Sequence, residues 1–188
     1  QDTFYIEGSA ELPSEKLVER VRKAHRRLWG YWNDEEAKKL VLRTHTTSVS
    51  ARMLAKLKPP AKVFTVDKVF RNETVDYKHL AEFHQVDGIV FAEDVTFRHL
   101  IGYLKHFFTK LGFERMRIRP AYFPYTEMST EVEVWFKPKR VWVELGGAGI
   151  IREEIVEALT GKNYPVLAWG LGLERIAMLY YGLNDIRE

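Results

Sequence analysis

The chain has 188 residues, 29 of them basic and 26 acidic, a net charge of +3 and no cysteine. This length suffices for one domain, 1–188, with a sizeable hydrophobic core. The absence of cysteine excludes disulfides and thiolate metal sites, and no apolar run is long enough to span a membrane. We therefore expect a cytoplasmic protein without a membrane anchor, and the modest charge neither demands nor excludes a polyanionic partner.

The first elements are predicted to be a short extended stretch at residues 1–6 and a helix. Ser14 is the expected N-cap, and apolar residues then follow helical spacing as far as Gly30. The outer surface of this helix is basic and carries Arg20, Arg22, Lys23, Arg26 and Arg27. Such a face can contact nucleic-acid phosphates, although solvated helix faces are commoner.

Residues 40–57 read as a short apolar strand, a turn rich in Thr and Ser, and a helix that ends before Pro59 and Pro60. His45 falls where the strand gives way to the helix, next to the hydroxyls of Thr46 and Thr47. A histidine in this setting is most often a capping or packing residue.

The segment 69–90 carries the most informative pattern. Its second half alternates so that Phe83, Gln85 and Asp87 share one face. Arg71 and Glu73 follow the same period before the loop, so pairing of the two halves as a hairpin directs all five side chains into one cleft. The cleft suits a charged, planar ligand. The alternative is the solvated face of an ordinary antiparallel hairpin.

A long amphipathic helix should begin after Asp94, end at Gly112 and cover the back of the sheet. The strand that follows places Arg115, Arg117 and Arg119 on one face, which could bind phosphate, although a solvent-facing strand explains the pattern at least as well. The runs 131–136 and 141–147 alternate strictly and predict two adjacent antiparallel strands. Glycines at 146–149 allow a ligand to approach the backbone closely, although they also serve simple turns.

Two later segments stand out. Phe123 and Tyr125 bracket a proline, whose fixed φ holds the two rings in a stiff arrangement; an aromatic corner of the core is the alternative. Near the end, a buried strand at 166–169 meets Gly170 and Gly172 and passes into a helix with Ile176 and Tyr180 among its inward positions. Arg175 lies in the first turn, where the helix dipole does not favour a cation, so a functional role is plausible.

These segments resemble those of a known enzyme family. FRNE with FHQVDG resembles motif 2 of class II aminoacyl-tRNA synthetases, and GLGLER resembles motif 3. Together with RTHTTSVSAR, FPYTE and GGAG, they follow the order and rough spacing of the phenylalanyl-tRNA synthetase α-subunit catalytic domain in its archaeal or eukaryotic form. The likeness covers essentially the whole chain. It departs from the pattern at Asp87, where Glu is usual, at Met128, where many members have Pro, and in the absent motif 1 region, which indicates a fragment.

The resemblance implies an α+β fold, an antiparallel β-sheet with helices on one side and the active site on the other. It implies that ATP and phenylalanine form phenylalanyl-adenylate, which then passes its acyl group to tRNA(Phe). Mg²⁺ is the implied metal, and a β-subunit is the implied partner in an αβ-containing hetero-oligomer.

The resemblance also assigns roles to residues. For ATP, Arg71 holds the α-phosphate, and His79 and Arg175 reach the distal phosphates. Phe83 and Glu73 hold the adenine. Arg71 and Arg175 are the implied catalytic residues, and Glu144 is the implied Mg²⁺ ligand. The charged end of phenylalanine is assigned to His45, Thr47, Gln85 and Asp87. The rest of the phenylalanine site is assigned to Phe123, Tyr125, Ala168 and Gly170.

Two other readings stay open. One is a synthetase-like paralogue acting on another amino acid such as pyrrolysine, against which FPYTE and Ala168 argue because they suit a phenyl ring. The other is a non-catalytic module of the same fold that binds nucleotide, tRNA or a partner subunit. Retention of Arg71, Phe83 and Arg175 together argues against the second reading.

Overall fold

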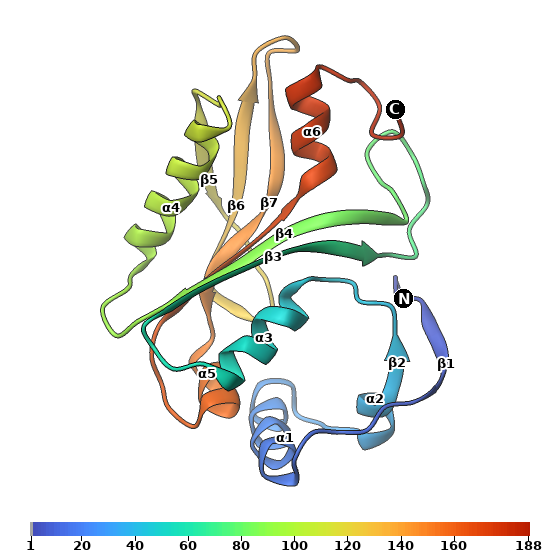
Figure 1. Ribbon diagram of the computed structural model, residues 1–188, viewed down its shortest axis with the longest axis vertical. Helices are drawn as coiled ribbons and strands as arrows, with labels where there is room; N and C mark the ends of the chain where they lie inside the picture. Colours follow the sequence, from blue (N-terminus) through green and yellow to red (C-terminus); the bar gives the residue numbers. More distant parts are fainter. Residues whose placement is uncertain (1) are drawn as a thin grey trace.

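The computed structural model describes residues 2–188 and is built around a six-stranded sheet with the strand order β3-β4-β8-β7-β6-β5 (Figure 1). Every neighbouring pair in this sheet is antiparallel. The strands are β3 (Ala61–Phe70), β4 (Glu82–Phe91), β5 (Met116–Pro120), β6 (Thr126–Phe136), β7 (Val141–Ile151) and β8 (Val166–Gly172). The predicted antiparallel α+β architecture is therefore confirmed, including the 69–90 hairpin, in which Val69 pairs with Phe83.

The back face of the sheet is covered by α4 (Phe97–Lys110) and α6 (Leu173–Tyr181). Leu100, Leu104 and Phe108 of α4 are almost fully buried and belong to one cluster with apolar residues of the inner strands. The sheet contributes Val90, Val132, Val134, Leu145, Leu167 and Leu171 to this cluster. The predicted covering role of the α4 segment is confirmed.

The front face is partly covered as well, by α3 (Thr47–Lys56) and α5 (Glu153–Thr160). Leu54 of α3 and Val156 of α5 pack with Ile89, Phe91 and other front-face residues at one end of the sheet. The expectation that helices lie on one side only is therefore wrong. The apolar pattern of β4 continues past Asp87, and that apolar end requires a cover of its own. The polar part of the front face stays open.

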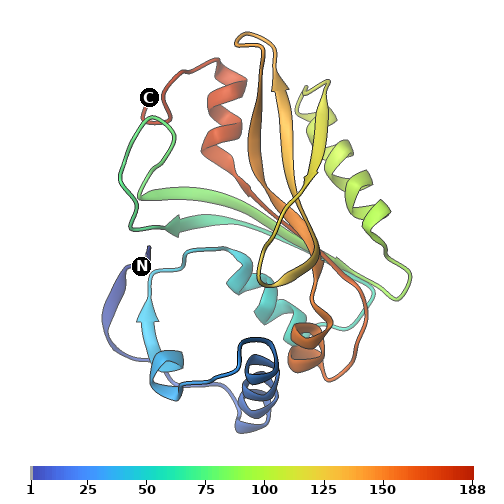
Figure 2. The ribbon, with the colours of Figure 1, turned by 180° about the vertical axis from the view of Figure 1, so that it is seen from behind.

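The N-terminal part folds beside this sheet (Figure 2). The strands β1 (Tyr5–Ser9) and β2 (Lys39–Val41) pair with each other, and α1 (Glu15–Trp29) packs against α5. Helix α1 ends at Gly30, as predicted, with a left-handed φ of 80° that glycine adopts without strain. A short helix α2 (Asp34–Lys38) was not predicted; Asn33 caps it by accepting hydrogen bonds from the N–H groups of Glu35 and Glu36.

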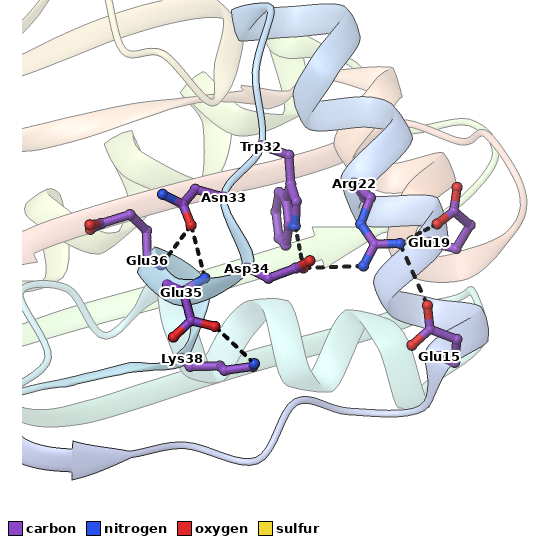
Figure 3. A network of polar contacts seen from close by, with 9 residues as sticks. All are labelled: Glu15, Glu19, Arg22, Trp32, Asn33, Asp34, Glu35, Glu36 and Lys38. Atoms are coloured by element: carbon purple, nitrogen blue, oxygen red, sulfur yellow. Dashed lines mark hydrogen bonds and ion pairs between the residues drawn. The ribbon is translucent and has the colours of Figure 1, made fainter.

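Some basic residues of α1 pair with acidic residues of the chain itself, and Figure 3 shows this for Arg22. Arg22 pairs with Glu19 at 2.5 Å, with Asp34 at 3.1 Å and with Glu15 at 3.5 Å. Arg27 lies 3.6 Å from Glu154 of α5. These pairs favour a structural, solvated face over a nucleic-acid contact.

Three local expectations need adjustment. Helix α4 is capped by Thr96 rather than Asp94, and the Thr96 N–H donates to Nδ1 of His99 at 3.0 Å. Tyr180 is 68% exposed, and its neighbour Leu179 occupies the core instead. β8 runs on through Gly170 to Gly172, so both glycines lie within the strand.

Among residues 2–188, no helix has the length and apolar character needed to cross a membrane.

Candidate active site

A cavity of about 530 Å³ opens on the uncovered part of the front face, and every site residue singled out from the sequence lines it. Residues from several regions of the chain meet there: the β2–α3 connection, the β3–β4 hairpin, the Phe123–Tyr125 segment, parts of β7 and β8, the first turn of α6, and Ile186. The lining residues that were predicted are His45, Thr47, Arg71, Glu73, His79, Phe83, Gln85, Asp87, Phe123, Tyr125, Glu144, Ala168, Gly170 and Arg175.

The floor of the cavity contains a buried carboxylate. Asp87 is only 3% exposed, and the hydroxyl of Thr47 donates to its Oδ2 at 2.6 Å while the hydroxyl of Ser50 donates to its Oδ1. Burial raises the pKa of Asp87, and these two hydrogen bonds oppose the shift. No cationic side chain pairs with Asp87 among residues 2–188. A buried anion held only by neutral hydroxyls is a strong receptor for a cationic ligand group.

The amide of Gln85 lies next to this carboxylate with its orientation fixed. The backbone N–H of Thr46 donates to Oε1 of Gln85 at 3.0 Å, and the Thr46 hydroxyl donates to the same oxygen at 3.3 Å. A backbone N–H only donates, so Oε1 must face α3 and Nε2 must face the other way. A Cβ added at Gly170 would lie 3.2 Å from Nε2, which explains the glycine there. The floor therefore offers a hydrogen-bond donor beside an anion.

One wall is aromatic. The rings of Phe123 and Tyr125 stack with centroids 6.2 Å apart, and the ring of His45 lies edge-on to Tyr125. Phe123 rests on the backbone of Gly147, where an added Cβ would lie 2.5 Å from the ring. Burial, with a smaller contribution from the charge of Arg71, lowers the pKa of His45 to about 4, so its imidazole is neutral at pH 7. This wall suits a flat apolar group.

The opposite end of the cavity is rich in cationic side chains. The Arg71 guanidinium lies 5.1 Å over the ring of Phe83, and its Nε donates to the carbonyl of Thr44 at 3.3 Å. Nη1 of Arg175 donates to the backbone carbonyl of Glu144 at 3.1 Å. His79 lines the same end. Two guanidiniums, an imidazole and an aromatic ring in one cavity match the needs of a base joined to several phosphates.

Glu144 is the acidic residue that was predicted to bind a metal ion. Within residues 2–188 no group of three or more His, Cys, Asp or Glu side chains is arranged to hold a metal ion. Mg²⁺ is usually held by one or two carboxylates together with substrate phosphates rather than by an all-protein cage. An exposed Glu144 beside the cationic end of the cavity fits that mode.

Some residues that hold or line the cavity were not assigned a site role from the sequence. Thr46 and Ser50 are buried and hold Gln85 and Asp87, and Ser50 lies one helical turn after Thr47 on the same face of α3. That spacing was the only available signal. Glu174 also lines the cavity and accepts a hydrogen bond from the backbone N–H of His84 at 2.7 Å. Lys78 and Ile186 also line the cavity, and no pattern marks them in the sequence.

The comparisons with known proteins agree with this geometry. The model of the tRNA synthetases class II core domain (F) matches residues 1–188, and the chain belongs to this family. It is similar to proteins named phenylalanine–tRNA ligase alpha subunit, with 54% identity in Methanopyrus kandleri, 52% in Methanothermobacter thermautotrophicus and 51% in Archaeoglobus fulgidus. Each match covers 100% of this chain and between 38% and 41% of the relative. The chain thus spans about two fifths of the length of these relatives.

Proposed function

We propose that this chain is the catalytic part of a phenylalanyl-tRNA synthetase α-subunit, which joins phenylalanine to ATP and passes the activated acyl group to tRNA(Phe). The observation that carries the proposal is Asp87, a buried carboxylate without a cationic partner among residues 2–188, in a cavity with an aromatic wall and a cationic end. A primary ammonium, an aromatic ring and a nucleotide are the groups that complement these surfaces.

The amino acid is oriented by its two ends. Its ammonium pairs with Asp87, and Thr47 and Ser50 keep both carboxylate oxygens in place. Nε2 of Gln85 donates to the carboxylate side of the ligand, because its own Oε1 is occupied. The phenyl ring packs against Phe123 and Tyr125, and Ala168 and Gly170 leave room on the strand behind it.

Chemistry at this site is mainly positioning and charge neutralisation. A carboxylate oxygen of phenylalanine forms a bond to the α-phosphorus of ATP, and the bond from that phosphorus to the bridging oxygen of pyrophosphate breaks. Arg71 offsets the charge that gathers on the α-phosphate, Phe83 and Glu73 hold the base, and His79 and Arg175 bind the departing pyrophosphate. Glu144 would hold Mg²⁺ together with phosphate oxygens, and the ion would supply further charge neutralisation.

The second step and the assembly follow from the same proposal. The acyl group passes from the adenylate to the terminal ribose of tRNA(Phe), with AMP as leaving group. The relatives are named alpha subunits, which supports a β-subunit as partner in a hetero-oligomer. We place this activity in the cytoplasm, where aminoacyl-tRNA serves translation.

An ATP–pyrophosphate exchange assay with each amino acid in turn tests the proposal. Exchange should depend on phenylalanine and be abolished by Asp87→Asn, while ATP binding by that variant is retained. Exchange with a different amino acid would indicate the paralogue. ATP binding without exchange for any amino acid would indicate a non-catalytic module.

A further inference from the structure

The aromatic wall of the cavity is carried by a loop. Phe123, Pro124 and Tyr125 lie in the connection between β5 and β6, and all three line the cavity. Within this connection, the backbone N–H of Thr126 donates to the carbonyl of Phe123 at 3.3 Å. A connection between strands has no ladder of hydrogen bonds of its own, so the position of the two rings depends on contacts from other parts of the chain.

The Phe123 end of the loop is held from β6. The backbone N–H of Phe123 donates to the hydroxyl oxygen of Ser129 at 3.4 Å, and the same hydroxyl donates to the carbonyl of Thr126 at 3.0 Å. Neither bond involves the carbonyl of Pro124 or of Tyr125. The tip of the loop therefore needs other partners.

Arg152 supplies these partners. Its backbone N–H donates to the carbonyl of Tyr125 at 3.1 Å, and Nε of its guanidinium donates to the carbonyl of Pro124 at 3.1 Å. Nη1 of the same guanidinium donates to Oε2 of Glu127 at 2.7 Å. The Arg152 side chain does not line the cavity. One residue thus holds the tip through its main chain and its side chain, from outside the space that a ligand would fill.

Arg152 is itself anchored in the core. It lies between Ile151, the last residue of β7, and the first residue of α5. Its carbonyl accepts hydrogen bonds from the N–H groups of Ile155 and Val156 at 3.0 Å and 3.1 Å. Ile151 and Val156 are buried and belong to the front-face cluster. A donor fixed between the end of a strand and the start of a helix can hold a loop in one position.

We propose that Arg152 is a positioning residue for the aromatic amino acid, because it fixes the Pro124–Tyr125 tip so that the wall is in place before the ligand enters. Hydrogen bonds from a guanidinium are stronger than neutral ones, and a loop that is ordered in advance loses less conformational freedom on binding. The effect should be confined to the amino acid, since other segments line the nucleotide end. The amino acid is phenylalanine if the proposed function holds, and the inference rests on it to that extent.

The first test compares Arg152→Ala, the conservative Arg152→Lys and the matched control Arg98→Ala, which removes an exposed arginine of α4 on the back of the sheet. In isothermal titration, Arg152→Ala should raise the Kd for phenylalanine about tenfold over the control and leave the Kd for ATP within about twofold. Arg152→Lys should give an intermediate Kd for phenylalanine, because an ammonium still donates to a carbonyl but lacks the fork that binds Pro124 and Glu127 together. An unchanged Kd for phenylalanine, or equal rises for both ligands, would overturn the assignment.

A second test needs neither activity nor a ligand. Amide hydrogen exchange of a peptide that covers residues 121–127, followed by mass spectrometry, reports how well the loop is held. Arg152→Ala should accelerate this exchange about fivefold or more over the control, while exchange in β4 stays unchanged. Arg152→Lys carries both tests if Arg152→Ala does not fold, with smaller changes in the same direction.

The two tests separate the inference from the proposed function. Equal exchange rates in the variants and the control would refute the role of Arg152. A parent protein that binds no phenylalanine, together with faster exchange in Arg152→Ala, would retain that role and lose the proposed function.

Discussion

The hydroxyl of Thr47 donates to Oδ2 of Asp87 across 2.6 Å, and this bond fastens the first turn of α3 to the floor of the cavity. The two residues are 40 positions apart in the chain. With Ser50 on the other oxygen, the carboxylate is held in place before any ligand enters. A charged group that is already oriented needs little rearrangement when it binds an ammonium.

Replacing Asp87 by Asn should affect the stability of the fold and the affinity for phenylalanine differently. The pKa of Asp87 in the folded chain is raised above 3.8. Between pH 3.8 and this raised pKa, the folded state binds more protons than the unfolded state, so the contribution of Asp87 to stability falls as the pH rises. The stability of Asp87→Asn relative to the parent should therefore increase as the pH rises above 3.8. Its Kd for phenylalanine should rise by a factor of about 30 or more. Calorimetric unfolding and titration check both, and a stability difference that stays flat above pH 3.8 would contradict the account.

His45 should make the opposite contribution to the pH dependence. The ordinary pKa of a histidine side chain is 6.5, and the pKa of His45 in the folded chain is about 4. In that window the unfolded state binds more protons, so stability should rise with pH by up to about 1.4 kcal/mol per pH unit. We expect the difference between the parent and His45→Gln to show this slope in urea denaturation, because the Asp87 contribution cancels. A difference that is flat from pH 4 to 6.5 would show that His45 is not buried as described.

Arg71→Ala should weaken the binding of an adenylate analogue much more than the binding of phenylalanine alone. The guanidinium lies over Phe83, at the end of the cavity assigned to the nucleotide, and charge-stabilising groups of this kind contribute roughly 2 to 4 kcal/mol. Isothermal titration of both ligands checks the difference. Equal losses for the two ligands would remove Arg71 from the phosphate site.

Gly147→Ala should damage the phenylalanine site. The new Cβ would lie 2.5 Å from the Phe123 ring, which must then move away from the wall. We expect phenylalanine affinity to fall about tenfold or more, with a smaller effect on ATP. Gly102→Ala in α4 is the matched control, because a Cβ there meets nothing within 4 Å. Similar losses of ATP and phenylalanine affinity in Gly147→Ala would indicate general damage instead.

Ala168→Gly should broaden acceptance toward para-substituted phenylalanines. Ala168 is 7% exposed and lines the cavity from β8, so removing its methyl group opens space without stranding a polar atom. Discrimination by a contact of this size amounts to about 1 to 3 kcal/mol. Exchange rates across a series of such analogues measure it. Exchange rates that are the same in the parent and the variant for every analogue would show that the far end of the ring does not contact Ala168.

The sequence by itself determined the antiparallel hairpin and which of its side chains share the cavity. Alternation along β4 is a local property, since successive side chains of a strand point to opposite faces, and it placed Phe83, Gln85 and Asp87 together correctly. The same logic identified the covering helix α4. The order and spacing of the short motifs identified the family before any fold was known.

Only the tertiary structure decided what holds these groups. Ser50 reaches Asp87 across 37 positions and Ile186 reaches Tyr77, and such contacts depend on the path of the chain rather than on any local period. The same holds for α3 and α5, whose position on the front face follows from the apolar end of β4 that they bury. The orientation of the Gln85 amide was decided in this way too, because it depends on a backbone N–H that folding brings to it from 39 positions away.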